Sequence, residues 1–229
     1  FNRLASFIYK EVGIKLNSNK KTMLEARLQK RLRQLKIKDH EAYCDFLFSS
    51  EGMRNELFQL IDSVTTNTTD FFREPRHFEL LSREYLPDWL KRHEKGRVLS
   101  AWSAGCSIGM EPYTLAMVFS EFARNNKGFA FSIMASDIST RALETARRGV
   151  YDEERVKAVP SSFKHAYLMR SKDRKRRQVR IVPELRRTVR FMRINFMDNF
   201  NFTNPLDMVF CRNVIIYFDR QTQEVLFRK

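Results

Sequence analysis

Short apolar segments alternate with amphipathic helical segments through the second half of the sequence, and this order limits the fold more than any other feature. RVLSAW (97–102) predicts a strand, and PYTLAMVFSEFARNN (112–126) predicts the helix that follows it. FAFSIMAS (129–136) and STRALETARRG (139–149) repeat that order, and TVRFMRI and LDMVFC add two more strands. Strands and helices in alternation predict a parallel sheet with right-handed crossovers and helices on its faces.

The residues before this alternation predict helices. Residues 20–38 place leucines at helical spacing on one face and basic side chains, Arg27, Lys30 and Arg33, toward the other. RNELFQLIDSV (54–64) predicts a second helix, followed by the polar TTNTTD and by a lead helix that opens at Pro75. We therefore expect an N-terminal helical domain at 1–64, a linker and lead helix at 65–95, and an α/β domain at 96–229.

The alternation is interrupted between Tyr151 and Arg187. There QVRIV alternates like a strand beside a very basic turn, which predicts an inserted β-subdomain at about 151–187, in the form of a β-ribbon. From Lys164 to Arg193 the chain carries 12 basic residues against two acidic ones. Much of the formal net charge of +15 therefore lies in this segment.

Charge and cysteine content limit the class of protein. A net charge of +15 predicts an acidic partner: nucleic acid, anionic lipid or an acidic protein surface. The three cysteines form no Cys-x-x-Cys pair, which argues against a disulfide framework or a zinc site and favours the cytoplasm. No apolar run approaches the roughly 20 residues that span a bilayer, so we expect no membrane insertion. The chain begins without methionine and ends inside a helical pattern, so we expect a fragment of a longer chain.

A glycine-containing loop joins the first predicted strand of the alternation to its helix. In WSAGCSIGMEPY (102–113), Gly105 and Gly109 let backbone N–H groups approach a ligand at the carboxyl end of the strand, where open parallel sheets bind ligands. The loop has no Gly-Lys-Ser/Thr sequence, and its glycine spacing is not that of a dinucleotide site. A phosphate is therefore a poor candidate for the ligand.

Two carboxylates narrow the chemistry of this ligand. Glu111, at the N-terminus of the helix, would repel a phosphate but accept hydrogen bonds from the amino group of a cation. Asp137 ends the next strand in ASDIS, where an acid receives ribose hydroxyls in nucleotide-binding folds. An adenosine with a positively charged amino-acid tail fits both carboxylates, and S-adenosylmethionine is such a molecule.

Five motifs together resemble the chemotaxis receptor glutamate O-methyltransferases, the CheR family. They are TTNTTDFFREPRHF, WSAGCSIGMEPYTLAM, ASDIS, RINFMD and FCRNVIIYFD, in the order and rough spacing of that family. The resemblance runs from Phe1 to the last residue. It implies an N-terminal helical domain, a Rossmann-like α/β methyltransferase domain and an inserted β-subdomain. It also implies transfer of a methyl group from S-adenosylmethionine to receptor glutamates, which gives S-adenosylhomocysteine and glutamate methyl esters for chemosensory adaptation.

The resemblance also implies the residues of the site. Because the acceptor carboxylate is already ionised near neutral pH, the reaction needs no general base and no metal. We expect Arg73 and Tyr217 to position that carboxylate by hydrogen bonds. The implied cofactor contacts are Asn67, Thr69, Arg73, Gly105, Glu111, Asp137, Asn195, Phe196, Asn213 and Val214.

The implied partner is the cytoplasmic helical bundle of a chemoreceptor. Arg27, Lys30 and Arg33 would dock its acidic face. Some members of the family dock a receptor peptide on a glycine-containing loop of the β-subdomain, but this chain has SKDRKRRQ (171–178) there. A second departure is Met110, which stands where the family usually has the first of two acids. We expect a monomer without a nucleic-acid partner.

Two other interpretations remain open from the sequence. The basic excess would suit a nucleic-acid methyltransferase, but CRNVIIYF lacks the Asn/Asp-Pro-Pro-aromatic tetrad common in amino-methylating enzymes of that class. A non-catalytic module could instead sense S-adenosylmethionine and bind RNA, DNA or a signalling nucleotide through its basic segment. The five motifs together favour the glutamate methyltransferase.

Overall fold

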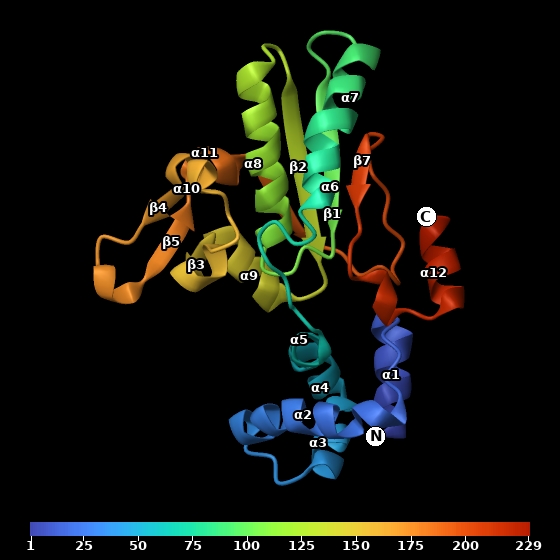
Figure 1. The fold of residues 1–229 in the computed structure, drawn as a ribbon. Coiled ribbons are helices and arrows are strands. Elements are labelled where there is room, and N and C mark those ends of the chain that lie inside the picture. The colour runs from blue at the N-terminus through green and yellow to red at the C-terminus, as the bar shows by residue number, and fades with distance from the viewer.

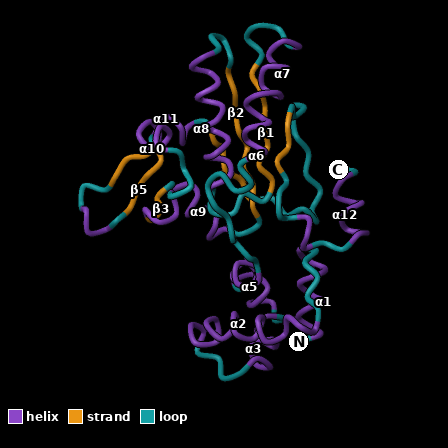
Figure 2. The backbone as a smooth tube through the Cα atoms, in the orientation of Figure 1, coloured by secondary structure: helices purple, strands orange, loops and turns teal.

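A parallel four-stranded sheet forms the centre of the second domain (Figures 1 and 2). The computed structural model describes the backbone of residues 1–229 and every side chain except that of Arg174. The strands lie in the order β6 (Val189–Arg193), β2 (Ala130–Asp137), β1 (Val98–Ala104) and β7 (Met208–Phe210), and each pairs in parallel with its neighbours. Their carboxyl ends therefore meet at one edge of the sheet. The predicted fold class, a helical domain followed by a Rossmann-like α/β domain, is confirmed.

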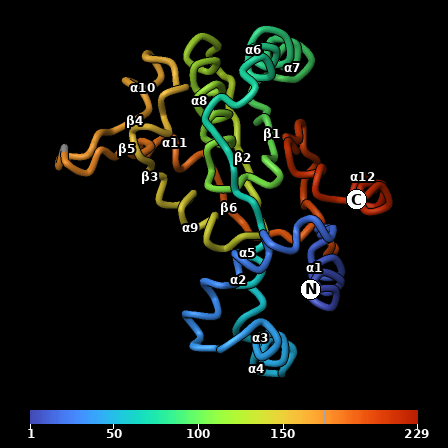
Figure 3. Tube along the Cα trace, turned by 60° about the horizontal axis from the view of Figure 1, so that its bottom comes forward, coloured from blue at the N-terminus to red at the C-terminus, as the bar shows by residue number. Residues whose placement is uncertain are grey.

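Helices cover one face of this sheet (Figure 3). They are α6 (Arg76–Leu80), α7 (Leu86–Arg92), α8 (Met110–Asn125) and α9 (Thr140–Arg148), and α8 and α9 touch where the Tyr113 hydroxyl donates to the Ala146 carbonyl at 2.8 Å. The sequence predicts a single lead helix, but a π-helical turn, η2 (Leu81–Tyr85), separates α6 from α7. Pro87 follows this turn and has no N–H for a regular helical bond, which accounts for the local widening.

The N-terminal domain has its own apolar core, which the leucines of α2 help to form. The prediction of a single helix over 54–64 is wrong, because the helix is interrupted at Glu56. The Glu56 side chain is 2% exposed and accepts two hydrogen bonds from Arg31, at 2.8 and 2.6 Å, and one from Tyr43 at 2.9 Å. The helices are α1 (Asn2–Val12), α2 (Lys21–Leu35), α3 (His40–Leu47), α4 (Ser50–Asn55) and α5 (Leu57–Val64), with a 3-10 turn η1 (Ser18–Lys20).

The inserted subdomain contains more than the predicted β-ribbon. Its antiparallel sheet has the order β3 (Val150–Asp152), β5 (Gln178–Ile181) and β4 (Leu168–Arg170). The apolar side chains of Val156, Val159 and Tyr167, in the segment between β3 and β4, are buried in the core of the α/β domain. The additional helical elements of the subdomain are η3 (Glu153–Val156), α10 (Ser161–Tyr167), η4 (Arg174–Arg176) and α11 (Pro183–Arg187).

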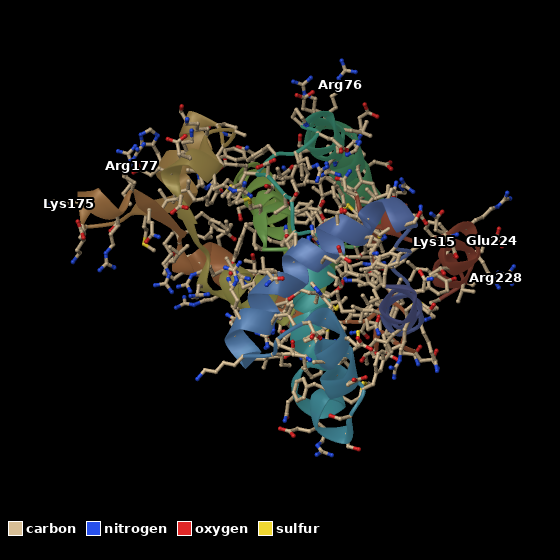
Figure 4. The ribbon with its side chains drawn as sticks, turned by 90° about the horizontal axis from the view of Figure 1, so that it is seen from below. Lys15, Arg76, Lys175, Arg177, Glu224 and Arg228 are labelled. Atoms are coloured by element: carbon tan, nitrogen blue, oxygen red, sulfur yellow. The ribbon has the colours of Figure 1, made fainter. Side chains whose placement is uncertain are left out.

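Polar contacts join the N-terminal domain to the α/β domain. Asp62, in α5, accepts a hydrogen bond from the Thr140 hydroxyl at the start of α9, 3.1 Å away. The Tyr9 hydroxyl donates to Asp219 at 2.7 Å, just ahead of α12 (Arg220–Phe227). Figure 4 shows Lys15, which follows α1, on the same side of the molecule as Glu224 of α12 and Arg228, which directly follows that helix. Across residues 1–229, no helix has the length and apolar character needed to cross a membrane.

Replacing Glu56 with glutamine is expected to lower the free energy of unfolding by about 2–4 kcal/mol, because Arg31 would lose its counter-ion in a mostly buried position. The exposed pair of Arg3 and Asp45, 4.0 Å apart, offers a control. Asp45→Asn should change the free energy of unfolding by less than about 0.5 kcal/mol. Urea unfolding followed by circular dichroism measures both variants, and equal losses would contradict the prediction.

Candidate functional site

A cleft with a volume of about 220 Å³ opens at the carboxyl edge of the sheet, between the two domains. Ile14, Leu16, Lys20 and Met23 of the N-terminal domain line one wall. The linker and the ends of the strands line the rest. Of the residues predicted to act in the site, those that line this cleft are Asn67, Thr69, Arg73, Gly105, Glu111, Asp137, Phe196, Asn213, Val214 and Tyr217.

The glycine loop is shaped by close packing against the segment after β7. Gly105 has a φ of 77°, and a Cβ at this position would lie 2.3 Å from Cγ2 of Val214. Any other residue would therefore displace Val214 and also strain the backbone. The backbone N–H groups of Gly105 and Cys106 both donate to the Ser136 carbonyl at 2.8 Å, which ties the loop to the end of β2.

Glu111 lies at the start of α8 with its carboxylate in the cleft. One carboxylate oxygen accepts a hydrogen bond from the Ser103 hydroxyl at 2.8 Å, and the other is 3.5 Å from the Arg212 guanidinium. Burial raises the pKa of Glu111 to about 7, although the Ser103 hydrogen bond and the Arg212 charge act in the opposite direction. Its ionised form is therefore costly in the ligand-free cleft, and a cation there would stabilise it.

Asp137 ends β2 and is 8% exposed. Its two carboxylate oxygens accept backbone hydrogen bonds from Ser107 at 2.7 Å and from Ser139 at 2.9 Å. Burial raises the pKa of Asp137, and these amides partly oppose the shift. Since each carboxylate oxygen has two lone pairs, both keep capacity to accept a ligand hydroxyl.

Strained backbone surrounds the cleft. Four residues other than glycine adopt the left-handed conformation there: Phe72 and Glu74 in the linker, Ser107 in the glycine loop, and Asn213 after β7, with φ values of 50° to 58°. This conformation is a genuine outlier for a residue as bulky as phenylalanine. Such strain persists only where the surrounding contacts hold it in place, and it is concentrated at functional sites.

Arg73 lies in this strained linker, with its side chain 37% exposed. Its guanidinium donates to the Thr68 carbonyl at 3.2 Å and lies 3.9 Å from the Glu74 carboxylate. Tyr217 belongs to the 3-10 turn η5 (Ile215–Tyr217), and its carbonyl accepts a hydrogen bond from the backbone of Lys15. Both predicted positioning residues line the same cleft, although they lie 144 positions apart in the sequence.

Arg212 is a further residue of the site, in addition to those predicted from the sequence. Its guanidinium donates to the Arg73 carbonyl and pairs with Glu74 at 3.2 Å as well as with Glu111. Its side chain is 12% exposed. The available signal was its place directly before Asn213 in FCRNVIIYFD, one of the five quoted motifs. The apolar wall from the N-terminal domain is a further addition, because no local pattern predicts which helix meets the cleft.

Two predicted site residues have other contacts in the structure. Asn195 does not line the cleft: its side-chain amide donates to the Glu11 carbonyl at 2.8 Å and thereby joins the two domains. Arg27 donates to the carbonyls of Val64 and Thr65, at 2.7 and 3.3 Å, and so anchors the linker to α2. Its guanidinium is therefore engaged inside the chain, whereas Lys30 and Arg33 are exposed on α2.

Replacing Glu111 with glutamine is expected to stabilise the ligand-free protein at pH 8. A carboxyl whose folded pKa is raised from 4.5 to about 7 lowers the free energy of unfolding as pH rises between these values, and by a constant amount above them. Glu111→Gln should therefore raise the free energy of unfolding by about 2–3 kcal/mol at pH 8 and by close to zero at pH 4.5. Thermal unfolding across this range, with the exposed Glu79→Gln as control, measures it. A gain that does not vary with pH would contradict the assignment.

Two family models match in succession: "CheR methyltransferase, all-alpha domain" over residues 1–65 and "CheR methyltransferase, SAM binding domain" over residues 67–229. The chemotaxis protein methyltransferase of Borreliella burgdorferi is 39% identical to this chain, and the match covers 100% of the chain and 81% of that protein. Chemotaxis protein methyltransferase 2 of Pseudomonas aeruginosa is 37% identical, with coverages of 100% and 79%. The protein from Escherichia coli is 36% identical, with coverages of 100% and 77%. The chain therefore belongs to the CheR family and is an S-adenosylmethionine-dependent methyltransferase.

Proposed function

We propose that this enzyme methylates glutamate side chains on the cytoplasmic helices of a chemoreceptor and produces glutamate methyl esters for chemosensory adaptation. The observation that carries the proposal is that one cleft contains both the buried carboxylates of Glu111 and Asp137 and the partly exposed guanidinium of Arg73. The carboxylates suit a cationic adenosine cofactor, and the guanidinium suits an anionic acceptor. The similar proteins named as chemotaxis methyltransferases support a chemoreceptor as the acceptor.

The residues of the cleft fit S-adenosylmethionine. Glu111 would accept hydrogen bonds from the amino group of the methionine part, and the positive charge would favour the ionised carboxylate that burial disfavours. Asp137 would accept hydrogen bonds from the ribose hydroxyls. Ile138, Phe196 and Val214 line the cleft with apolar surface for adenine. We assign further contacts to Asn67, Thr69, Gly105 and Asn213, which line the same cleft.

The chemistry requires alignment rather than proton transfer. The bound cofactor supplies a methyl group made electrophilic by the sulfonium charge. Since a glutamate side chain is ionised near neutral pH, the protein need not remove a proton from it. Arg73 orients the incoming carboxylate through its planar fork, and Tyr217 donates a second hydrogen bond. The Arg212 contact with the Arg73 carbonyl holds the backbone of that residue in place.

Charge complementarity directs the acceptor to this cleft. Lys30 and Arg33 are exposed on α2, and α2 belongs to the domain that forms one wall of the cleft. An acidic receptor helix would meet these cations before its glutamate reaches Arg73. We further propose that the enzyme acts in the cytoplasm as a monomer.

Transfer of a radiolabelled methyl group from S-adenosylmethionine to a purified receptor cytoplasmic domain tests the proposed function. We expect alkali-labile label on the receptor, lost when its glutamates are replaced by alanine, and none on RNA or DNA. Arg73→Lys should lower kcat by about tenfold or more, because lysine keeps the charge and loses the planar fork that orients the carboxylate.

The outcomes separate the competing functions. Label on nucleic acid alone would overturn glutamate methylation. Tight cofactor binding without transfer to any acceptor would instead indicate a protein that senses S-adenosylmethionine. An Arg73→Lys variant with normal kcat would remove Arg73 from its assigned role.

The double variant Lys30→Ala and Arg33→Ala is expected to raise KM for the receptor and to weaken the dependence of KM on salt, because exposed charges act mainly on encounter. Its affinity for S-adenosylhomocysteine should equal that of the unmodified enzyme. Lys91→Ala with Arg92→Ala, on the exposed end of α7, is a control of equal charge. If the control pair has the same effect, α2 does not dock the receptor.

A further inference from the structure

The inserted subdomain contacts the linker that lines the cofactor cleft. Arg155, in η3, donates a hydrogen bond to the Thr69 carbonyl at 2.7 Å, and its guanidinium lies 3.7 Å from the Asp70 carboxylate. Beside it, the Phe71 ring meets the edge of the Tyr151 ring with centroids 5.1 Å apart. Three consecutive linker residues, 69 to 71, are thus held by side chains of the insertion.

The same subdomain also contacts the glycine loop. The Tyr151 hydroxyl donates to the Ile108 carbonyl at 2.7 Å. The Arg155 guanidinium lies 3.8 Å from the sulfur of Met110, which is fully buried and directly precedes Glu111. The insertion therefore reaches both segments that carry the predicted cofactor residues on this side of the cleft.

The linker needs such support because its backbone is strained. Phe72 and Glu74 have φ values of 54° and 57°. The turn at residues 70–73 is closed by a long hydrogen bond of 3.4 Å, from the Arg73 backbone N–H to the Asp70 carbonyl. Thr69 is 8% exposed and lines the cleft. A hydrogen bond that holds the Thr69 carbonyl in place therefore also restricts the position of Arg73, four residues later in the strained linker.

We propose that the inserted subdomain positions the cofactor cleft for methyl transfer, with Arg155 as the positioning residue. Arg155 holds the Thr69 carbonyl and thereby places the linker residues 67–73 against the cleft.

Arg155 contacts the linker, whereas Arg177, another basic residue of the insertion, forms its ion pairs within the insertion. Arg177 lies at the outer end of the subdomain beside Lys175 (Figure 4). Its guanidinium pairs with Glu154 at 3.1 Å and Glu153 at 3.9 Å, both within the insertion. Arg177→Ala therefore removes the same charge and two exposed ion pairs without touching the linker, and it serves as a control for the loss of charge.

The test compares Arg155→Ala, Arg155→Lys and Arg177→Ala in the full chain. Calorimetric titration with S-adenosylhomocysteine measures affinity, and hydrogen exchange measures protection of residues 65–74. We expect Arg155→Ala to weaken binding by about fivefold or more and to speed exchange in the linker, because one charged hydrogen bond is lost. Arg155→Lys, which keeps one donor, should recover part of the affinity, and Arg177→Ala should match the unmodified protein.

Two results would overturn the proposal. One is unchanged affinity and linker exchange in Arg155→Ala. The other is an equal loss in Arg177→Ala, which would indicate a general effect of charge. Thermal unfolding distinguishes a local effect on the linker from a general folding defect. The Arg155 side chain is 41% exposed, so loss of its contacts should lower Tm by only a few degrees. Since these measurements need no acceptor, they stand even if receptor methylation fails.

Discussion

The Arg212 guanidinium joins the three segments that form the cleft. Arg212 lies just after the end of β7. Its guanidinium pairs with Glu111 at the start of α8 and contacts both the carboxylate of Glu74 and the carbonyl of Arg73 in the linker. The guanidinium also lies over the Phe78 ring, 5.3 Å from its centroid, in a cation–π contact. Because a buried cation needs its counter-ions, the linker, α8 and the end of β7 must keep their relative positions.

This arrangement is costly in the ligand-free protein. Glu111 and Asp137 are both buried carboxyls whose pKa values burial raises, and strained residues surround them. A structure selected for stability alone would replace such groups with apolar ones. In the proposed binding mode, a cationic cofactor with ribose hydroxyls would use both carboxylates, so the features that cost stability without the cofactor would strengthen its binding. The inserted subdomain contacts this strained linker through the hydrogen bond from Arg155 to the Thr69 carbonyl.

The sequence predicted more of the fold than of the contacts. Periodicity located the strands of the sheet, and the glycine loop with Glu111 and Asp137 indicated a cationic adenosine ligand. The predicted helix over 54–64 was wrong because apolar spacing does not reveal that Glu56 turns inward to meet Arg31. Asn195 and Arg27 were placed in the site by sequence motif or charge, yet their side chains bond to carbonyls elsewhere in the chain. Such partners are distant in sequence and leave no local signal.

The amino-acid sequence by itself determined the order of elements, the α/β class and the chemical types gathered at the carboxyl ends of the strands, because these depend on local spacing and on the geometry of parallel sheets. Only the tertiary structure decided that the N-terminal domain forms a wall of the cleft, that Arg212 pairs with Glu111, and that Arg155 holds the linker. These contacts join residues far apart in the sequence, and their partners are selected by packing and by the need to satisfy buried polar groups.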